Sequence, residues 1–418
     1  MTDQMTAPVA VGDAIDLLVG EAIHGGWCVA RVATQTGGNT AVAAAGGFVV
    51  LVRHALPGER VRAVITQVTS RLARADAVEI LLPAAERVRP PCPYARPDGC
   101  GGCDWQHASL AAQRAFKARV VSQQLRRIAG IEREVTVAPM PGEQDGLGWR
   151  TRVRFAVGGD GRAGLHKHRS QAVIAIGDCL IAHPLVTEAE VTRQSWPGAR
   201  AVEVAVAPQT GQRAITTAGG RVRGSDRKHL TYRAAGRDWR VSAAGFWQVH
   251  PQAADTLAEA VLAGLSPRPG ETALDLFCGA GLFAGVLATA VGSAGAVIAV
   301  ERDAEAVGDA RHNLRDATWA RVHRGDAAEV IGRIGLSGAS IAVLDPPRAG
   351  VDRELIAALC AGPSMRKIAY VSCDPATLAR DLAVLARYGW QLAELRAFDA
   401  FPMTHHVECV AIAEPQPA

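Results

Sequence analysis

The chain has 418 residues, of which 49% are hydrophobic and 21% charged, and its formal net charge is +4. This composition is typical of a globular protein with two or three domains and excludes wholesale disorder. No uninterrupted run of about 18 apolar residues occurs, so we expect no membrane-spanning helix. The first residues include Asp3, Asp13 and Asp16 and lack a basic start before an apolar core. We therefore expect no signal peptide and a cytoplasmic location.

The first predicted domain is a small β-barrel over residues 11–72, preceded by a loose tail over residues 1–10. Short β-like runs over residues 15–19, 29–32, 48–52 and 61–68 alternate with turn residues such as Pro57 and Gly58. Short strands with frequent turns are typical of barrels. A run of positive charge begins within it and is balanced only by Glu59; the run comprises Arg53, Arg60, Arg62, Arg71 and Arg74.

A second basic segment, Arg150-Thr151-Arg152-Val153-Arg154, alternates like a strand and would place three guanidinium groups on one face. Such a face either keeps an edge strand soluble or binds a polyanion. Two basic segments in one chain favour a polyanion partner.

The nine cysteines include a cluster in the stretch PPCPYARPDGCGGC, where Cys92, Cys100 and Cys103 have the spacing C-x7-C-x2-C. A C-x2-C pair in a glycine-rich turn directs two thiolates at one point, and Cys179 is a candidate fourth ligand. Iron–sulfur and zinc sites both use four thiolates, and the spacing alone does not choose between them. Unrelated free thiols are the structural alternative.

The central region, residues 83–240, contains a predicted helix near residues 109–128 and then returns to β-like runs. From residue 241, and most clearly from Glu271, strands alternate with helices rich in alanine and leucine, as in a parallel α/β sheet. A buried-type strand over 272–277 leads into Cys278-Gly279-Ala280-Gly281 and a helix over 282–290. Glycines at this point let the backbone turn and approach a ligand, although the motif by itself also fits nicotinamide cofactors.

Acidic residues follow the next strands of this predicted sheet. Glu301 ends the strand over 296–300, Asp326 follows the strand at 322–323, and Asp345 follows the strand over 341–344. The carboxyl ends of parallel strands meet at one edge, which is where ligands bind in such folds. We interpret Glu301 as a ribose ligand and Asp326 as an adenine contact.

Two further residues suggest chemistry at the same edge. Cys373 follows the strand over 368–372 and precedes a helix that begins near Pro375, and a helix N-terminus favours a thiolate. Glu408 interrupts an apolar closing strand. A cysteine at a strand end is usually structural, but a cysteine and a carboxylate beside a nucleotide-like pocket favour a catalytic pair.

Taken in order, the motifs DLFCGAG, DPPRAG, YVSCDPATLARD and HHVE resemble those of the 5-methyluridine RNA methyltransferases that carry a TRAM domain and an iron–sulfur cluster. The resemblance covers nearly the whole chain, because the predicted barrel with LPGERV resembles a TRAM domain and the cysteine spacing resembles the cluster motif. It implies an α/β plus β fold. In this fold an N-terminal OB-like TRAM barrel is followed by a central β-rich domain with the four-cysteine site and a C-terminal Rossmann-like methyltransferase domain over residues 241–418.

The resemblance also implies roles for individual residues. Cys373 would add to carbon 6 of a uracil, and Glu408 would remove the carbon 5 proton after methyl transfer. The implied partner is RNA, ribosomal rather than transfer RNA, and the implied state is a monomer. S-adenosylmethionine would contact Gln248, Phe277, Glu301, Asp326 and Asp345, and a [4Fe–4S] cluster would be held by Cys92, Cys100, Cys103 and Cys179.

Two departures from the pattern concern the nucleophile and the cofactor. Asp374 stands where many relatives have Asn, and a carboxylate there is expected to raise the pKa of the neighbouring thiol. His250 replaces a commoner Asn. The alternatives are a non-catalytic RNA-binding factor, which leaves Cys373 and Glu408 unexplained, and an RNA methyltransferase acting on another base, such as cytosine, or on an amino group. A nicotinamide oxidoreductase is disfavoured because no hydride-transfer site follows the glycine loop.

Overall fold

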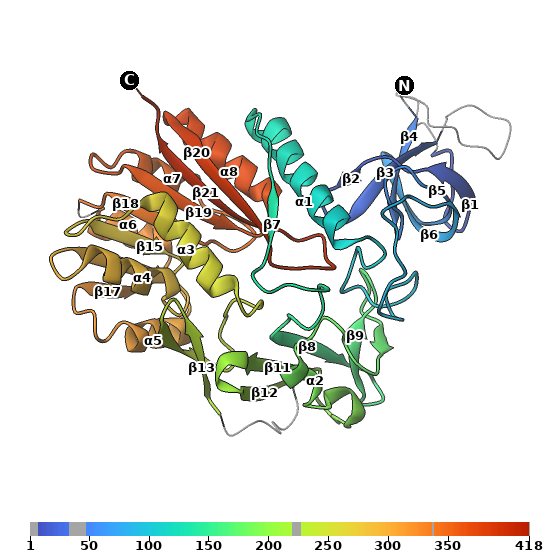
Figure 1. Cartoon of the computed structure of the whole chain (residues 1–418), viewed down its shortest axis with the longest axis horizontal. Helices are drawn as coiled ribbons and strands as arrows, with labels where there is room; N and C mark the ends of the chain where they lie inside the picture. The colour runs from blue at the N-terminus through green and yellow to red at the C-terminus, as the bar shows by residue number, and fades with distance from the viewer. Residues whose placement is uncertain (1–6, 33–46, 220–226, 337, 418) are drawn as a thin grey trace. The chain divides into compact units, whose positions relative to one another are not determined.

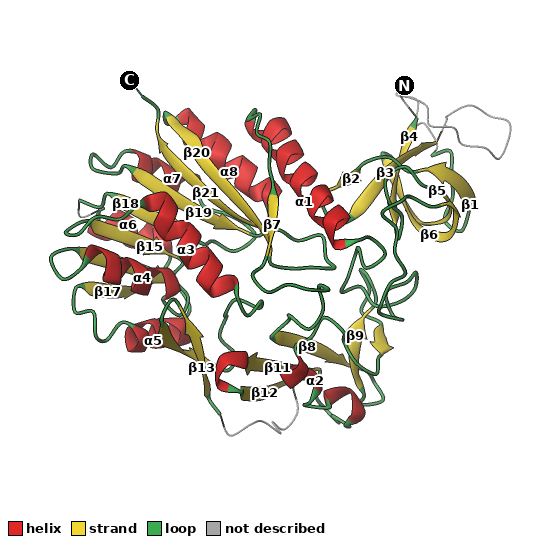
Figure 2. Ribbon diagram, viewed as in Figure 1, coloured by secondary structure: helices red, strands yellow, loops and turns green. Residues whose placement is uncertain are grey.

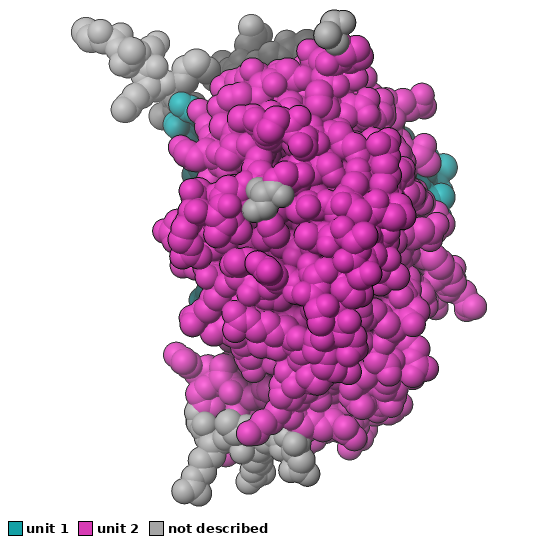
Figure 3. All heavy atoms as spheres, turned by 90° about the vertical axis from the view of Figure 1, so that its left-hand side faces the viewer, with its two compact units in different colours: residues 1–120, 165–176, 402–405 teal, residues 121–164, 177–401, 406–418 magenta. Residues whose placement is uncertain are grey.

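The computed structural model describes residues 7–32, 47–219, 227–336 and 338–417. The chain divides into two compact units, which are coloured separately in Figure 3. The first contains residues 1–120, 165–176 and 402–405, and the second contains residues 121–164, 177–401 and 406–418. Each unit is described by itself below.

The first unit is built on a six-stranded sheet whose strand order is β1-β5-β6-β4-β3-β2. Among the described residues of this sheet, β4 and β6 are the strands that pair in parallel, and β1 also contacts β3, so the sheet curls towards closure as expected for a barrel. Valines and alanines at alternate positions fill its interior, including Val50, Val52, Val61 and Ala63. The strands are β1 (Ala14–Leu18), β2 (Ala22–Ile23), β3 (Trp27–Val32), β4 (Phe48–Arg53), β5 (Arg60–Val68) and β6 (Leu72–Leu82).

After β6 the chain runs through the proline- and cysteine-rich stretch without regular structure and then enters α1 (Leu110–Gln124) and a short π-helix (Leu125–Ala129). The first unit ends within α1 at Val120, and the π-helix belongs to the second unit. The first unit also takes in residues 165–176, from the end of β9 (Ala163–His166) through β10 (Val173–Ala175), and the segment 402–405. The amide of Gly101 donates a 3.0 Å hydrogen bond to the backbone oxygen of His166, at the end of β9. The cysteine-rich stretch is therefore held against residues far from it in sequence.

The second unit begins with the small sheet elements of the central region. In it β8 (Arg152–Val157) pairs with β11 (Ala201–Ala207), and β11 pairs with β12 (Gln212–Ala218). A separate hairpin is formed by β13 (His229–Ala234) and β14 (Arg237–Ser242). The connecting helices are α2 (Pro184–Thr187) and the 3₁₀ turns Val191–Arg193 and Pro208–Thr210.

The rest of the second unit is an eight-stranded sheet of order β17-β16-β15-β18-β19-β21-β20-β7 (Figures 1 and 2). The first five strands are parallel, whereas β21 runs antiparallel to both β19 and β20. The strands are β7 (Val137–Pro139), β15 (Thr272–Leu276), β16 (Ala296–Glu301), β17 (Ala320–Arg324), β18 (Ile341–Leu344), β19 (Lys367–Ser372), β20 (Trp390–Asp399) and β21 (Glu408–Pro415).

Helices cover both faces of this sheet, which explains its almost continuously apolar strands. On one face Ala273, Val343 and Val371 pack in the same core cluster as Leu257 of α3 and Phe283 of α4. The intervening strand residues are buried on the opposite face, where α6, α7 and α8 follow one another in contact. The helices are α3 (Ala253–Leu265), α4 (Leu282–Val291), α5 (Ala304–Asn313), α6 (Ala327–Ile334), α7 (Arg353–Cys360) and α8 (Pro375–Arg387). Within the described residues, no helix has the length and apolar character needed to cross a membrane.

Candidate active site

The loop between β15 and α4 is a tight turn in which three residues have positive φ angles. Phe277, Gly279 and Gly281 have φ values of 78°, 53° and 92°. Glycine adopts positive φ angles without steric cost, whereas for Phe277 such an angle is unfavourable. Phe277 is held in this conformation by a 3.0 Å hydrogen bond from its amide to the backbone oxygen of Val300. A Cβ on Gly279 would meet no atom within 4 Å, so open space lies against the loop.

Asp275 ties this loop to the sheet. It is fully buried in β15, and its Oδ2 accepts a 2.6 Å hydrogen bond from the amide of Ala284 in the first turn of α4. Its Oδ1 has no hydrogen-bond partner among the described residues. Burial raises the pKa of Asp275 to about 8, and the charges of Asp345 and Glu301 act in the same direction. These three carboxyl groups therefore lie close enough to interact.

Glu301 is the last residue of β16, and the adjacent backbone orients its carboxylate. Oε2 accepts a 2.9 Å hydrogen bond from the amide of Gly279, and Oε1 accepts a 2.7 Å bond from the amide of Asp303. Each carboxylate oxygen can accept more than one hydrogen bond, so both retain capacity for a ligand hydroxyl. The sequence-based prediction that Glu301 lies beside the glycine loop is consistent with this geometry.

Asp326 and Gln248 lie outside this group of interacting acids. Asp326 is the N-cap of α6, where its Oδ1 accepts from the amide of Ala328 at 2.9 Å. Gln248 lies in the loop between β14 and α3. Its neighbour Trp247 stacks on Tyr232, with ring centroids 5.1 Å apart, so the loop is anchored beside Gln248.

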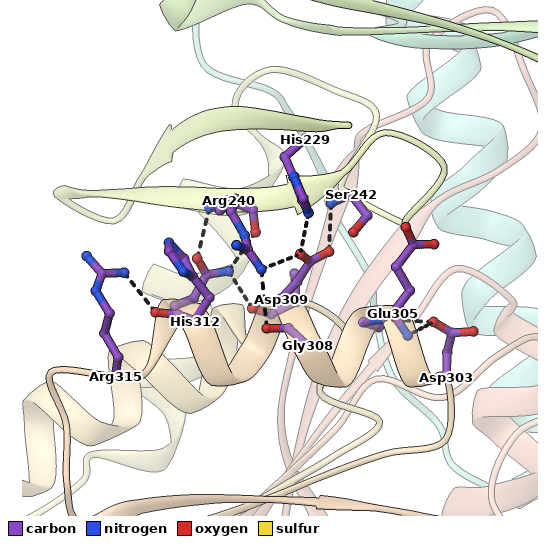
Figure 4. A network of polar contacts seen from close by, with 12 residues as sticks. His229, Arg240, Ser242, Asp303, Glu305, Gly308, Asp309, His312 and Arg315 are labelled. Carbon is purple, nitrogen blue, oxygen red and sulfur yellow. Dashed lines mark hydrogen bonds and ion pairs between the residues drawn. The ribbon is translucent and has the colours of Figure 1, made fainter. Parts of the chain in front are cut away.

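The hairpin that leads into the Gln248 loop is held against α5 by polar contacts that include those of the buried Asp309, as Figure 4 shows. Asp309 accepts a 2.6 Å hydrogen bond from the amide of Ser242, and its Oδ1 lies 3.4 Å from Nη2 of Arg240 and 3.8 Å from Nε2 of His229. Farther along, His250 stacks on Trp149, and burial lowers the pKa of this histidine to about 4. His250 is therefore neutral at pH 7.

Cys373 follows β19 directly and is half-buried at the N-terminus of α8. Burial raises the pKa of the Cys373 thiol to about 11, and the charges of Glu408 and Asp345 add to this effect. From the sequence, the adjacent Asp374 was expected to raise the pKa of this thiol. Asp374 instead caps α8, accepting hydrogen bonds from the amides of Ala376 at 3.0 Å and Thr377 at 2.9 Å. Glu408 is the carboxylate that opposes ionisation of the thiol most strongly.

Arg348 favours the thiolate of Cys373 and was not predicted from the sequence as a site residue. It lies in the loop after β18, and its positive charge near the sulfur lowers the thiol pKa against the effect of burial. Its Nη2 lies 3.1 Å from Nε2 of His406, and its backbone oxygen accepts a 3.0 Å hydrogen bond from Thr377. Two contacts therefore hold Arg348 beside the cysteine.

We expect Arg348→Gln to make Cys373 less reactive towards iodoacetamide at neutral pH. Because the guanidinium lowers the thiol pKa, its removal raises that pKa, and each unit of increase leaves about tenfold less thiolate at a given pH. The alkylation rate of Cys373, followed by peptide mass spectrometry, should reach its plateau at a higher pH. Arg348→Lys, which keeps a positive charge, should lie between, and the exposed Arg353→Gln should match the wild type. An unchanged pH profile in Arg348→Gln would rule out this role.

Glu408 opens β21 and is 5% exposed. The last residue pair between β19 and β21 is Ser372 with Cys409, so Cys373 and Glu408 are the next residues along the two strands. Burial raises the pKa of Glu408 well above its ordinary value, and the charge of Asp345 contributes. Burial also raises the pKa of Asp345, to about 7. Strongly perturbed groups that share one sheet edge are typical of a catalytic centre.

Of the residues predicted from the sequence, the structure brings Glu301, Asp345, Cys373 and Glu408 into one electrostatically coupled group at the carboxyl edge of the sheet. Sequence reasoning missed Asp275 and Arg348 as members of this group. A signal for Asp275 was available, because it is the one acid within an otherwise apolar strand. Arg348 directly follows two prolines at the same edge, which was a weaker signal.

The four cysteines with metal-ligand spacing are divided between the two units. Cys92, Cys100 and Cys103 lie in the first unit and Cys179 in the second, and each is half-buried. The amide of Gly102 lies 3.4 Å from the Cys100 sulfur, as in turns that hold thiolates. Within the ranges that the structure describes, no group of three or more His, Cys, Asp or Glu residues meets in metal-binding geometry.

Family models match three parts of the chain. The model described as "tRNA (Uracil-5-)-methyltransferase" matches residues 336–414, which contain Asp345, Arg348, Cys373 and Glu408. The TRAM domain model matches residues 8–78. A model of protein-L-isoaspartate(D-aspartate) O-methyltransferase matches residues 250–335, which contain the glycine loop.

Whole-chain relatives extend the similarity. The chain is 45% identical to an uncharacterised RNA methyltransferase of Streptomyces coelicolor, over 99% of this chain and 96% of the relative. It is 32% identical to the 23S rRNA (uracil(1939)-C(5))-methyltransferase RlmD of Pseudomonas putida, over 87% of this chain and 88% of that protein. A tRNA (uracil-54, C5)-methyltransferase of Pyrococcus abyssi, solved with S-adenosyl-L-homocysteine, is similar in fold. The TM-score is 0.67 at 22% identity, over 88% of this chain and 96% of that one.

Proposed function

The chain belongs to the family of S-adenosylmethionine-dependent RNA methyltransferases that includes the uracil-C5 enzymes, and from this premise we propose that it methylates carbon 5 of a uridine in RNA. The observation that carries the proposal is the pairing of Cys373 with Glu408 at the ends of β19 and β21. A methyltransferase acting on an amino group needs no such pair, because a nitrogen lone pair can attack the methyl group directly.

The nucleophile in this reaction is Cys373. Carbon 5 of uracil is a poor nucleophile, so the Cys373 thiolate first adds to carbon 6 and turns carbon 5 into an enolate carbon. Arg348 stabilises the thiolate that this step requires. The bound cofactor supplies the methyl group, which carbon 5 attacks. Because a stacked base is inaccessible, the uridine must be flipped out or unpaired.

Glu408 completes the reaction as the base that removes the proton from carbon 5, after which the sulfur–carbon 6 bond breaks and the thiolate leaves. Its raised pKa makes the ionised carboxylate a stronger base than an exposed glutamate. The negative charge on Glu408 opposes a free Cys373 thiolate, but the sulfur bonded to carbon 6 carries no charge. Ionisation of Glu408 is therefore least opposed at the stage where the base is needed.

The acids and the loop at the carboxyl edge fit S-adenosylmethionine. Glu301 has free acceptor capacity beside Gly279, where open space lies, and Asp275 presents a buried oxygen without a partner among the described residues. We propose Gln248, Phe277, Glu301, Asp326 and Asp345 as the cofactor contacts. Glu301 would accept from the ribose hydroxyls, and Asp345 would face the cationic methyl donor, whose charge favours the ionised form of a carboxyl with a pKa of about 7.

Ribosomal RNA is the proposed substrate. The relative named as a 23S rRNA methyltransferase is 32% identical and covers most of the chain, whereas the neighbour named as a tRNA enzyme is 22% identical and supports the fold alone. The TRAM match at residues 8–78 supports RNA as the partner. We further propose that the protein is a cytoplasmic monomer. Its proposed domains are the TRAM-like barrel over residues 11–72, the central domain over residues 83–240 and the methyltransferase domain over residues 241–418.

The test of the proposed function is the identity of the methylated nucleoside. RNA from a strain lacking the gene is incubated with the protein and methyl-labelled S-adenosylmethionine, separated into ribosomal and transfer RNA, and digested to nucleosides. We expect label in 5-methyluridine from ribosomal RNA. Label confined to cytidine or adenosine products would refute the assignment, and label in transfer RNA alone would refute the substrate class.

We also propose a [4Fe–4S] cluster held by Cys92, Cys100, Cys103 and Cys179. The support is the C-x7-C-x2-C spacing and the Gly102 amide, which lies 3.4 Å from the Cys100 sulfur. Protein purified without oxygen should contain iron and acid-labile sulfide, and Cys100→Ser should lose both. Cys360→Ser, which changes a half-buried cysteine elsewhere, should retain them. Stoichiometric zinc without labile sulfide would refute the cluster.

A further inference from the structure

Three arginine side chains surround one tryptophan in the first unit. The guanidinium carbons of Arg53, Arg74 and Arg169 lie 6.0, 5.7 and 5.5 Å from the centroid of the Trp27 ring. They come from β4, β6 and the turn after β9, and the His168 ring packs edge-on against Trp27 at 5.7 Å. We call these five residues the Trp27 cluster. Residues far apart in the sequence therefore form one positively charged cluster.

Several donors in the Trp27 cluster are buried without a hydrogen-bond acceptor. Among the described residues, Nη2 of Arg53, Nε of Arg74 and Nε2 of His168 have no hydrogen-bond partner. Arg53 is 4% exposed, and its Nη2 lies 3.5 Å from Oδ1 of Asp104 without hydrogen-bond geometry. Leaving buried charged donors unsatisfied is costly, so a ligand with several acceptor oxygens would be stabilised here.

Two acidic residues face the guanidinium groups of the cluster. Oδ1 of Asp104 lies 3.5 Å from Nη2 of Arg53, and Oδ2 of Asp104 lies 2.6 Å from Nδ1 of His405. Asp76 is the β-sheet partner of Arg53. The three guanidinium groups of the cluster therefore outnumber the two acids that face them.

The neighbouring histidines do not change this balance at neutral pH. Burial lowers the pKa of His168 to about 4, of His54 to about 3 and of His107 to about 4, with the charge of Arg53 acting in the same direction on each. Burial and the charges of Arg74 and Arg53 also lower the pKa of Arg169. The guanidinium groups thus repel one another, and an anion between them would relieve that repulsion.

We propose that the Trp27 cluster binds one phosphodiester group of the RNA substrate, an inference that rests on the proposed function. A phosphodiester carries one negative charge, and its oxygens can accept hydrogen bonds from guanidinium groups whose buried donors lack a partner among the described residues. Trp27, Arg53 and Arg74 lie within the TRAM match at residues 8–78. Because the Trp27 ring is only 5% exposed, it serves to space the guanidinium groups and not to stack on a base.

The test is the salt dependence of RNA binding by the full chain. Arg169→Gln, at an exposed position, should weaken binding of a 23S ribosomal RNA transcript by about tenfold, as expected for the loss of a charged hydrogen bond. The slope of log K against log salt should fall by about 0.7–0.9, the value for one phosphate contact. Arg74→Gln should do the same. Arg71→Gln, an exposed arginine just before β6, should change both quantities much less.

An unchanged salt slope in both Arg169→Gln and Arg74→Gln would overturn the inference, and so would a loss of RNA affinity in Arg71→Gln equal to that in Arg169→Gln. A third contradicting result is saturable binding of inorganic phosphate that Arg169→Gln abolishes while RNA affinity is unchanged. Retained binding of S-adenosylmethionine and an unchanged melting temperature exclude unfolding as the cause of a loss. Binding is measured without methyl transfer. Failure of this inference is therefore distinct from failure of the uridine assignment, which the labelled nucleoside reports.

Discussion

Glu408→Gln is expected to arrest the reaction after methyl transfer and to accumulate a covalent complex between the protein and RNA. Without the carboxylate, Cys373 can still add to carbon 6 and carbon 5 can still take the methyl group, but the carbon 5 proton stays and the thiolate cannot leave. Turnover should fall by more than about 10²-fold, the lower range for a positioned acid–base group. The complex should run as a slow band on a denaturing gel when RNA and S-adenosylmethionine are both present.

The matched control is Glu414→Gln, which makes the same chemical change on the same strand, β21, away from the coupled acids. It should turn over like the wild type and give no slow band. The double variant Cys373→Ala, Glu408→Gln should also give no band, because the bond to carbon 6 cannot form. A band that survives in the double variant, or wild-type turnover by Glu408→Gln, would contradict the assigned pair.

Cys373→Ala is expected to abolish methyl transfer while RNA and cofactor binding survive. The side chain is half-buried at the end of β19 and the adjacent cap of α8 is made by Asp374, so its removal leaves the local structure intact. Loss of the nucleophile should cost more than about 10²-fold in turnover, at least as much as loss of a positioned base. Methyl incorporation and RNA affinity are measured on the same preparation.

Cys360→Ala serves as the control, because Cys360 is also half-buried but ends α7 outside the coupled group. It should retain full activity. If Cys373→Ala methylated RNA at the wild-type rate, the mechanism through a carbon 6 adduct would be wrong, and an enzyme acting on a nitrogen would explain the chain better.

The parallel part of the large sheet was predictable because its strands are short apolar runs separated by turn residues. The strand predicted over 341–344 coincides with β18, and the helix expected to begin near Pro375 is α8. β20 and β7, which extend the sheet beyond β21, were not predicted. β20 contains Glu394 and Arg396 among apolar residues, and β7 has only three residues, so neither has the pattern of a buried strand.

The individual site residues were predictable where they stand at strand ends, as Glu301, Asp345 and Cys373 do. Their protonation was not, because it depends on which charges the fold brings together. In the sequence, the carboxylate next to the Cys373 thiol is that of Asp374, but in the structure this carboxylate accepts hydrogen bonds from two helix amides. The carboxylate whose charge acts on the thiol is that of Glu408, 35 residues farther along the chain. Segments such as 402–405, which fold with the first unit, likewise depend on long-range contacts that no local pattern encodes.

The central claim is that Cys373 bonds to a uridine that becomes methylated at carbon 5, and peptide mapping of the Glu408→Gln complex tests it most directly. The complex is digested with protease and nuclease, and the cross-linked fragment is sequenced by mass spectrometry. The account predicts a single cross-link, at Cys373, to a uridine that carries one added methyl group. A cross-link at another cysteine, such as Cys278 or Cys409, or to a base other than uridine, would contradict it.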